Sequence, residues 1–364
     1  MSSVSAGIVG LPNVGKSTIF NAISSGKAET ANYPFCTIDP NSGVVCVPDV
    51  RLEQISEIIP TQKIVPALLE LVDIAGLVKG ASKGEGLGNQ FLGHIKNVNA
   101  ILHIVRCFDS TEITHVDGSV NPSRDVEVID TELMLKDLET LEKSRARLEK
   151  MRKTGDKESS AKLDAVAKAI EKINGGVPAR RALLDEEKEL LSELNLITLK
   201  PVLYVANVDE NGLKEDNNFV KELQEIAKKD NALCIKISGK IEEELAQLEE
   251  EDKKEFLADL GLKEPGLNVL ARAAYDLLGL QTFFTAGQTE NRAWTIKKGF
   301  SAPQAAGVIH SDFERGFIKA EVYTLEDLLK YKSETEIRNH GKMRLEGKDY
   351  VVKDGDIMFF KFNV

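Results

Sequence analysis

The chain has 364 residues, 42% of them hydrophobic and 29% charged, with a formal net charge of −11. This length exceeds a usual single hydrophobic core, the acidic balance disfavours wholesale coating of a nucleic acid, and no apolar run reaches the roughly 18 residues of a membrane span. The chain lacks a signal-peptide pattern, and its four cysteines lack metal-ligand spacing. We therefore expect a reduced, cytoplasmic protein with no membrane partner.

A phosphate-binding loop is predicted close to the start of the chain. The apolar residues 7–9 lead into Gly-Leu-Pro-Asn-Val-Gly-Lys-Ser-Thr, and a helical pattern follows at residues 18–23. A strand, the spacing Gly-x-x-x-x-Gly-Lys-Ser and a helix together are the context that such a loop requires. Its backbone N–H groups converge on phosphate oxygens, and its glycines let the backbone curl. The predicted nucleotide-binding residues are Gly10, Asn13, Val14, Gly15, Lys16, Ser17 and Thr18.

Polar side chains in and after this loop predict a magnesium site. Lys16 would place its ammonium on the terminal phosphates, and the Ser17 hydroxyl would ligate Mg²⁺. Thr37 would ligate the same ion when the γ-phosphate orders its segment. Asp73 directly follows the apolar run 68–72 and would hold a Mg²⁺-bound water, while the N–H of Gly76 would sense the γ-phosphate.

The central part of the chain predicts a parallel α/β sheet. Apolar runs recur at residues 68–72, 100–105, 202–206 and 232–237, with helical or loop stretches between them. In open sheets of this kind the ligand lies at the carboxyl ends of the strands. We assign residues 1–127 and 196–280 to one nucleotide-binding domain. The acidic stretch 242–255 is predicted to be a solvated helix face.

A long helical insertion interrupts this domain at residues 128–195. Its apolar residues recur three or four positions apart, which is typical of amphipathic helices: Met134, Leu138, Leu141, Leu148 and Met151, then Leu163, Val166, Ile170 and Ile173. Residues 153–156 suggest a turn between two antiparallel helices. Such an arm is either simply solvated or docks on a partner.

The tail, residues 281–364, changes character. Short strands are predicted at 282–285, 289–295, 317–323 and 348–362, with a helix around 302–313, which favours a small β-grasp domain. Its aromatic residues, Phe283, Phe284, Trp294 and Phe317, are expected in the core; the alternative is that aromatic residues exposed there stack on RNA bases. With 13 Lys/Arg and 12 Asp/Glu it is the part least repulsive to a polyanion. The candidate phosphate contacts are Lys297, Lys298, Arg338, Lys342 and Arg344.

The base-reading motif predicts adenine. The order of the motifs resembles the translation-factor class of phosphate-loop GTPases, which ends a strand with Asn-Lys-x-Asp. Here Asn207 is followed by Val208 and, two positions later, by Glu210, whose longer carboxylate cannot sit at the same depth under guanine. Asn207 can still pair with adenine. Ser238 and Gly239, after the last strand, would line the other side of the base.

With this departure the chain is similar to the YchF family, the Obg-like ATPases. The resemblance rests on Gly-x-Pro-Asn-Val-Gly-Lys-Ser, Asn-x-x-Glu, the inserted hairpin and the β-grasp tail, and it spans nearly the whole chain. It implies a G domain, a helical hairpin and a C-terminal TGS domain. It also implies preferential hydrolysis of ATP, a cytoplasmic location and association with ribosomes.

The group that positions the attacking water is not the usual one. Leu77 stands where many GTPases have glutamine, and an apolar side chain cannot hold water. His115, in the loop after the run 100–105, is the candidate to replace it, so the predicted catalytic residues are His115 and Gly76. Otherwise a partner supplies the group.

We therefore expect a slow, Mg²⁺-dependent ATPase that switches conformation on or near the ribosome or ribosomal RNA. Two alternatives stay open: a GTPase of the same class, or an ATP-loaded adaptor protein whose hydrolysis is incidental. No DNA partner is expected, and the protein is expected to be a monomer.

Overall fold

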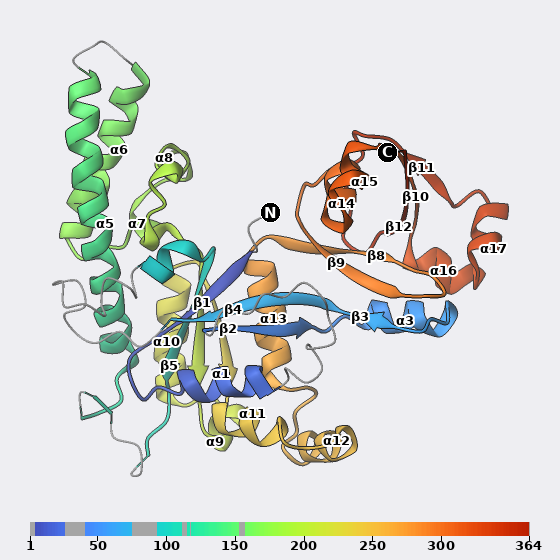
Figure 1. The fold of residues 1–364 in the computed structure, drawn as a ribbon. Coiled ribbons are helices and arrows are strands. Elements are labelled where there is room, and N and C mark those ends of the chain that lie inside the picture. The colour runs from blue at the N-terminus through green and yellow to red at the C-terminus, as the bar shows by residue number, and fades with distance from the viewer. Residues whose placement is uncertain are drawn as a thin grey trace. The chain divides into compact units, whose positions relative to one another are not determined.

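The computed structural model describes residues 4–25, 41–74, 93–110, 115–116, 118–152 and 157–363 (Figure 1). The chain forms two compact units. The first contains Met1–Val44 and Glu70–Ala274, and the second contains Val45–Leu69 and Tyr275–Val364. Each unit is built from segments that are far apart in the sequence. No described helix is long and apolar enough to cross a membrane.

The first unit is organised around a sheet with the strand order β2-β4-β1-β5-β6-β7 among the described residues. Strand β1 pairs in parallel with β4 and β5, and β5, β6 and β7 continue in parallel. Every residue of β5 and β6 is buried, as expected for central strands of a sheet covered on both faces. The predicted α/β fold is confirmed. The strands are β1 (Ser5–Val9), β2 (Ser42–Val47), β4 (Ala67–Asp73), β5 (Ala100–Arg106), β6 (Val202–Asn207) and β7 (Leu233–Ile237).

The helices of this unit follow the strands along the chain. They are α1 (Lys16–Ser25), α9 (Glu210–Lys214), α10 (Asn218–Lys229), α11 (Gly239–Leu245), α12 (Glu250–Asp259) and α13 (Gly266–Leu277). The acidic stretch is therefore two helices, and the prediction of a solvated face is wrong for Glu242. Its buried carboxylate accepts hydrogen bonds from the backbone N–H groups of Gly266 (2.7 Å) and Leu267 (3.2 Å), which it caps at the start of α13.

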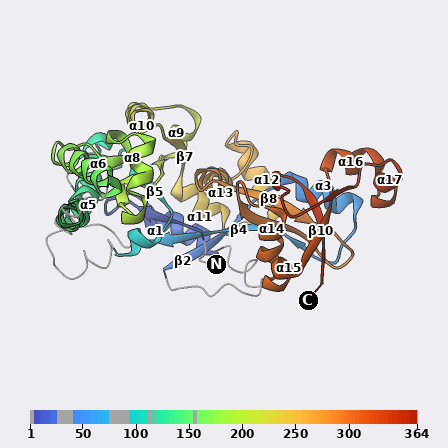
Figure 2. The same ribbon diagram turned by 90° about the horizontal axis from the view of Figure 1, so that it is seen from above.

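The helical insertion forms an arm of two long helices, α5 (Pro122–Arg152) and α6 (Lys157–Asn174), which lie side by side (Figures 1 and 2). Most of the predicted apolar stripe is buried between them, including Leu141, Leu148 and Val166, whereas Met151 is exposed. The predicted turn at 153–156 lies outside the described residues. Short helices follow: α7 (Ala179–Ala182), α8 (Asp185–Leu190), η2 (Ser192–Leu194) and η3 (Ile197–Leu199).

A buried charge network attaches the base of this arm to the sheet. The Arg180 guanidinium contacts Asp130 of α5 and Asp230 after α10, each at 2.7 Å. The Tyr204 hydroxyl of β6 donates to Asp230 at 2.6 Å. Because buried charges are costly unless they are paired, these contacts favour one position for the base of α5.

The second unit has its own sheet, with the order β11-β10-β12-β8-β9-β3 among the described residues. Strands β8 and β12 pair in parallel at its centre, β9 and β10 flank them in antiparallel pairs, and α14 (Ala302–Ile309) packs on one face. This is the expected β-grasp arrangement. Phe283, Phe284 and Phe317 are buried, and Trp294 packs against the core. The strands are β3 (Ile64–Val65), β8 (Leu280–Thr285), β9 (Asn291–Lys297), β10 (Phe317–Tyr323), β11 (Arg344–Glu346) and β12 (Ile357–Phe362), and the further helices are α15 (Ser311–Arg315), α16 (Leu325–Tyr331) and α17 (Glu334–Asn339).

The segment between β2 and β4 belongs largely to this second unit, which the sequence did not reveal. It contains α3 (Val50–Ile58) and β3, which adds to the sheet by pairing in parallel with β9. The fully buried Asn291 of β9 donates to the Ser56 hydroxyl (3.1 Å) and to the Ile59 carbonyl (2.8 Å). A segment that the sequence places in the nucleotide-binding domain is thus a structural part of the C-terminal sheet.

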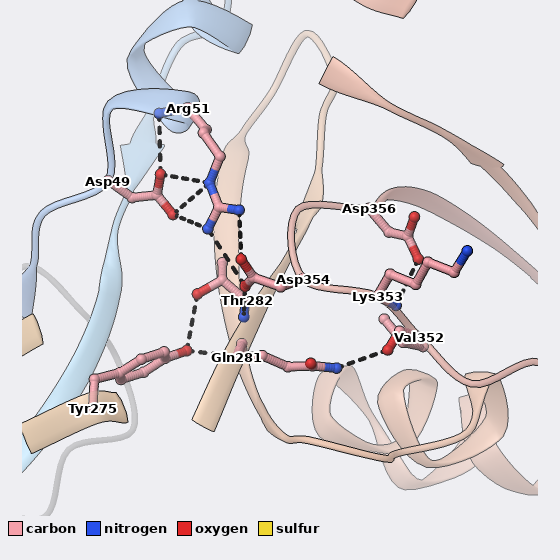
Figure 3. A network of polar contacts seen from close by, with 9 residues as sticks. All are labelled: Asp49, Arg51, Tyr275, Gln281, Thr282, Val352, Lys353, Asp354 and Asp356. Carbon is pink, nitrogen blue, oxygen red and sulfur yellow. Dashed lines mark hydrogen bonds and ion pairs between the residues drawn. The ribbon is translucent and has the colours of Figure 1, made fainter. Parts of the chain in front are cut away.

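Arg51 at the start of α3 fastens this segment (Figure 3). Its guanidinium donates from Nε and Nη2 to Asp49, at 2.9 and 2.7 Å, and from Nη1 to Asp354, at 2.7 Å. Asp354 also accepts the backbone N–H of Thr282 in β8 at 2.9 Å. The guanidinium lies 5.3 Å from the centre of the Phe284 ring. One side chain therefore joins α3 to β8 and to the turn before β12.

Candidate nucleotide site

The phosphate-binding loop lies between β1 and α1, where the sequence predicts it. Gly15 has φ +97°, which L side chains rarely adopt, and a Cβ there would collide with the Asn207 amide. A Cβ on Gly10 would collide with the carbonyl oxygen of Ile104 in β5. Gly10 is therefore required by the close approach of β5, and Gly15 by its backbone conformation and the Asn207 side chain. Asn13 also has a positive φ of 62°, a conformation that asparagine tolerates.

The buried Lys16 and the half-buried Asp73 carry opposite charges beneath the loop. Lys16 is buried, and its Nζ donates to the Leu11 carbonyl at 2.6 Å. Burial lowers the pKa of Lys16 to about 8, although the Asp73 carboxylate opposes this change. Burial likewise raises the pKa of Asp73, opposed by Lys16. A weakly hydrated ammonium interacts strongly with an incoming anion, so the site is prepared for phosphate.

The residues around Asp73 fit a hard cation. Asp73 Oδ1 is buried and has no hydrogen-bond partner among the described residues. Ser17, at the start of α1, is exposed. Carboxylate and hydroxyl oxygens are ligands that Mg²⁺ accepts alongside water and phosphate. Thr37 and Gly76, the other residues predicted for the metal and the γ-phosphate, lie outside the described residues.

The Asn207 side chain joins the two loops that flank the site. Its Nδ2 donates to the Val14 carbonyl at 2.8 Å, and its Oδ1 accepts the backbone N–H of Gly239 at 2.9 Å. The sequence predicts that this amide reads adenine; the structure places it, buried, as a bridge between the phosphate loop and α11. One further donor and one further lone pair of the amide stay available for a base.

A cavity of about 870 Å³ opens beside the phosphate loop, at the carboxyl ends of the strands. This volume is typical of a small-molecule site. It brings together predicted residues from three separate segments of the chain. Its lining is formed by Asn13, Gly15, Thr18, Phe108, Asp109, Ser110, Asn207, Val208, Asp209, Glu210, Ser238, Gly239, Lys240, Ile241 and Glu244.

Among the lining residues that the sequence did not predict, Phe108, Asp109 and Ser110 come from a segment with no predicted site residue. They follow β5, and their position at the carboxyl end of a central parallel strand was the available signal. The buried Arg106 supports this segment, since its Nε donates to the Phe108 carbonyl at 3.0 Å. Its guanidinium also lies 4.7 Å from the Phe108 ring centre, which holds an aromatic face at the cavity wall.

The residues of the segment predicted to read the nucleobase lie partly in the protein interior and partly at the rim of the cavity. Val208 is buried, whereas the Glu210 side chain is 57% exposed and pairs with Lys214 at 2.9 Å. Asp209 caps α9 by accepting the N–H of Gly212 at 2.9 Å. The carboxylate that departs from the GTPase pattern thus lies at the cavity rim, on the first residue of a short helix.

His115 is buried next to the first turn of α5. Its Nε2 lies 2.9 Å from Asp125 Oδ2, and its Nδ1 lies 3.4 Å from the Arg124 guanidinium. It is absent from the residues that line the cavity. The described geometry gives His115 a buried hydrogen bond with Asp125, and its catalytic role stays a prediction.

Comparison with known proteins identifies relatives along the full length. A family model described as a 50S ribosome-binding GTPase matches residues 5–136. A model for the C-terminal domain of YchF-type GTPases, described as a protein of unknown function, matches residues 280–363. The ribosome-binding ATPase YchF of Escherichia coli O157:H7 is 53% identical, with 98% of this chain and 99% of the relative covered. The Bacillus subtilis protein of the same name is 52% identical, with both chains fully covered.

Solved structures agree with these matches. The YchF GTPase of Schizosaccharomyces pombe superimposes with a TM-score of 0.88 at 39% identity, with 99% of this chain and 98% of that chain covered. A GTP binding protein from Pyrococcus horikoshii OT3 superimposes with a TM-score of 0.61 at 21% identity, which shows a common fold.

Proposed function

The chain belongs to the YchF family, and we propose that it hydrolyses ATP to ADP and phosphate and uses this reaction to switch conformation on or near the ribosome. The observation that carries this proposal is the cavity beside the phosphate loop, which is lined by Gly15 of that loop, by Asn207 and by Gly239. The names of the relatives support both ATP hydrolysis and ribosome binding. A ribosome partner in turn favours a cytoplasmic location.

The phosphate loop would bind the triphosphate through its backbone and Lys16. The N–H groups at the start of α1 carry the positive end of the helix dipole. Lys16 would exchange its contact with the Leu11 carbonyl for phosphate oxygens, gaining the charge interaction that burial denies it in the free protein. The same contacts stabilise the negative charge that moves during phosphoryl transfer.

Mg²⁺ would be held by Ser17, Asp73 and Thr37. The unpaired buried oxygen of Asp73 and the exposed Ser17 support this assignment. Within the described residues no three His, Cys, Asp or Glu side chains gather as a metal site, so substrate phosphates and water would complete the coordination. When bound, the ion neutralises charge on the β- and γ-phosphates.

We infer that the base pocket prefers adenine. Glu210 lies at the rim of the cavity, and its side chain is longer than that of the aspartate that reads guanine in related GTPases. Asn207 retains one donor and one acceptor for the base, and Ser238 and Gly239 lie at the opposite wall. Phe108 supplies an aromatic face that suits either purine, so the choice between purines falls on Asn207 and Glu210.

His115 would orient the attacking water, because Leu77 has no polar group for this task. Gly76 would sense the γ-phosphate through its N–H. In the described state the His115 imidazole contacts Asp125, so His115 would leave this contact to reach the water. Such rearrangements of loops on nucleotide binding are common among switch proteins.

We propose three functional parts: the nucleotide-binding domain (1–127 and 196–280), the helical arm (128–195) and a C-terminal TGS domain (281–364), to whose sheet the segment Val45–Leu69 also contributes. The basic side chains of the C-terminal domain that we predicted to contact RNA are less accessible than the sequence suggests. Arg338 pairs with Glu321 at 3.1 Å, and Arg344 pairs with Asp356 at 3.2 Å. Lys342 precedes β11, so it does not share a strand face with Arg344. The proposed protein acts as a monomer without a DNA partner.

The experiment that tests the function compares ATP and GTP directly. We expect tighter binding of ATP by the unaltered chain, and faster multiple turnover when ribosomes are added. Equal or tighter GTP binding would favour the ordinary GTPase. If the protein binds ATP and associates with ribosomes, but ATP hydrolysis does not change its release from the ribosome, the adaptor function would be favoured.

A further inference from the structure

Arg106 is the last residue of β5 and precedes the segment that lines one wall of the nucleotide cavity. Its exposed fraction is 1%, and it is among the largest fully buried side chains of the described residues. Burial of a cation is costly unless its charge and its donors have partners. Its in-register neighbour on β6 is Asn207, the residue predicted to read the base. A cation is thus buried at the carboxyl ends of the central strands, where the ligand of such sheets lies.

Two contacts of Arg106 converge on Phe108. Its Nε donates to the Phe108 carbonyl at 3.0 Å, and the guanidinium carbon lies 4.7 Å from the centre of the Phe108 ring. One side chain therefore holds both the backbone and the ring of the same residue. The attraction between a cation and a ring is strongest where water is excluded, as it is around a fully buried guanidinium. The Phe108 ring is consequently restrained at the cavity wall in the free protein.

The backbone that leads to Phe108 is held from both sides. The Cys107 N–H donates to the Asn207 carbonyl at 2.8 Å, and the Cys107 carbonyl accepts from the Asn217 side chain at 2.8 Å. Asn217 is itself fixed, because its side chain caps the start of α10. Arg106 extends this series of contacts by one residue, to the carbonyl and the ring of Phe108.

The charge of Arg106 is balanced by two acidic residues. Burial lowers the pKa of the Arg106 guanidinium, and the Asp109 and Asp125 carboxylates oppose this change. Asp125 also shares a hydrogen bond with His115, the predicted catalytic residue. Arg106 could therefore act on the base wall or on hydrolysis. The hydrogen bond and the ring contact favour the base wall, because both end on Phe108.

We propose that Arg106 is a positioning residue for nucleotide binding, which holds the Phe108 ring in the orientation that stacks on the purine. This role rests on the proposed function, which places the base in this cavity. A restrained ring binds the base more tightly than a mobile ring, because less side-chain freedom is lost on binding. Within the described part of the chain Arg106 does not line the cavity, so its contribution passes through Phe108.

Lysine at position 106 would keep the charge and lose the positioning. An ammonium still balances the Asp109 and Asp125 carboxylates, which limits damage to the fold. It lacks the planar guanidinium, however, and cannot donate from the Nε position while a second group faces the ring. Arg106→Lys is therefore the substitution that separates the two contacts to Phe108 from the buried charge.

The test compares the full chain with Arg106→Lys, Phe108→Leu and the double variant. Two probes are used: a non-hydrolysable ATP analogue with Mg²⁺, and inorganic tripolyphosphate with Mg²⁺, which has phosphates but no base. Isothermal titration calorimetry gives each Kd, and steady-state ATP hydrolysis gives kcat and KM. The matched control is Arg180→Lys, which alters a second buried arginine of the same unit, in the charge network at the base of the arm.

We expect Phe108→Leu to weaken binding of the ATP analogue by about 5- to 150-fold, the range for one stack of a base on an aromatic ring. Arg106→Lys should weaken it by about 2- to 12-fold, the cost of ordering one side chain, and should raise KM with kcat unchanged. Both variants should bind tripolyphosphate as the parent does. In the Phe108→Leu background, Arg106→Lys should have no further effect, because the ring on which it acts is absent. The control should retain both affinities.

Three results would overturn this role. Equal weakening of the ATP analogue and tripolyphosphate by Arg106→Lys would place its effect on the phosphate loop or on the fold. The same loss in the Phe108→Leu background would show that Arg106 does not act through the ring. A lower kcat with unchanged KM would assign Arg106 to Asp125 and His115.

The unaltered chain separates this role from the proposed function itself. If that chain binds the ATP analogue no more tightly than tripolyphosphate and hydrolyses no ATP, the proposed function fails. If it binds and hydrolyses ATP while Arg106→Lys has the parental Kd and KM, Arg106 is a structural residue only and the proposed function stands.

Discussion

The phosphate-binding loop and the C-terminal unit are assembled in opposite ways. The phosphate loop is one continuous run between β1 and α1, and its shape depends on the backbone of consecutive residues. The C-terminal unit takes α3 and β3 from a segment more than 200 residues away, and Arg51 reaches Asp354 across 303 positions. A local site can be read from a motif, whereas a composite unit depends on side chains whose partners no motif reveals.

The first way to sharpen this comparison is His115→Ala. If His115 orients water, the single-turnover rate should fall by about a hundredfold or more, with ATP affinity nearly unchanged. Quenched-flow measurement of phosphate release provides the rate. His310→Ala, an exposed histidine of the C-terminal unit, is the control. A rate equal to that of the parent, with faster hydrogen exchange in α5, would leave His115 only its hydrogen bond with Asp125.

Lys16→Ala should abolish much of the nucleotide affinity and leave the C-terminal unit intact. Loss of a charge-assisted contact to phosphate costs about 2–3 kcal/mol, or roughly 30- to 150-fold in Kd. Isothermal titration calorimetry with ATP gives the affinity, and Lys221→Ala on the surface of α10 is the control. Parental affinity in Lys16→Ala would exclude this ammonium from the phosphate site.

Asn207→Ala distinguishes two roles of this side chain, joining the phosphate loop to α11 and recognising adenine. Loss of the bonds to Val14 and Gly239 should weaken nucleotide binding by about 1–3 kcal/mol. A pure bridge would weaken ATP and GTP equally, while a reader of adenine would weaken ATP more. We expect the larger loss for ATP, measured as paired dissociation constants. Equal losses would contradict the adenine assignment and retain the bridge.

Arg51→Ala tests the composite unit. The substitution leaves the Asp49 and Asp354 carboxylates without their shared partner, and we expect the C-terminal unit to lose about 1–3 kcal/mol of stability. Hydrogen exchange should accelerate at the amides of β3, β8 and β9 while β1 and β5 stay protected. The control is Arg315→Ala, which removes an exposed pair with Asp312 and should change little. Unchanged exchange at β3 would mean that Asn291 and strand pairing suffice.

The smallest expected effect is a pH dependence of the same contact. Burial raises the pKa of the Asp354 carboxyl, but hydrogen bonds from Arg51 and Thr282 outweigh it and hold the pKa below the ordinary 3.8. This depressed pKa contributes stability above pH 3.8 that is lost as pH falls through the lower folded-state value. Thermal melts between pH 6 and 3 should show a smaller acid loss for Asp354→Asn than for the parent chain. Identical acid profiles would contradict this contribution.

The sequence alone determined the parts whose physics is local. Gly15, Lys16 and Ser17 were assigned from spacing, because a phosphate loop needs a fixed order of backbone conformations. The parallel sheet and the stripes of α5 and α6 followed from periodicity, since burial on one face selects apolar residues at the repeat of the element.

Tertiary structure decided what depends on two distant segments meeting. The sequence predicts that Glu242 is a solvated acid, but in the fold its carboxylate accepts two backbone N–H groups at the start of α13. Asn207 became a bridge because β6 ends beside the phosphate loop. The segment with Arg51 joined the C-terminal sheet because Asp354 and Asn291 meet it there. Such polar groups are ordinary in sequence, and only the fold supplies the partner that makes their burial favourable.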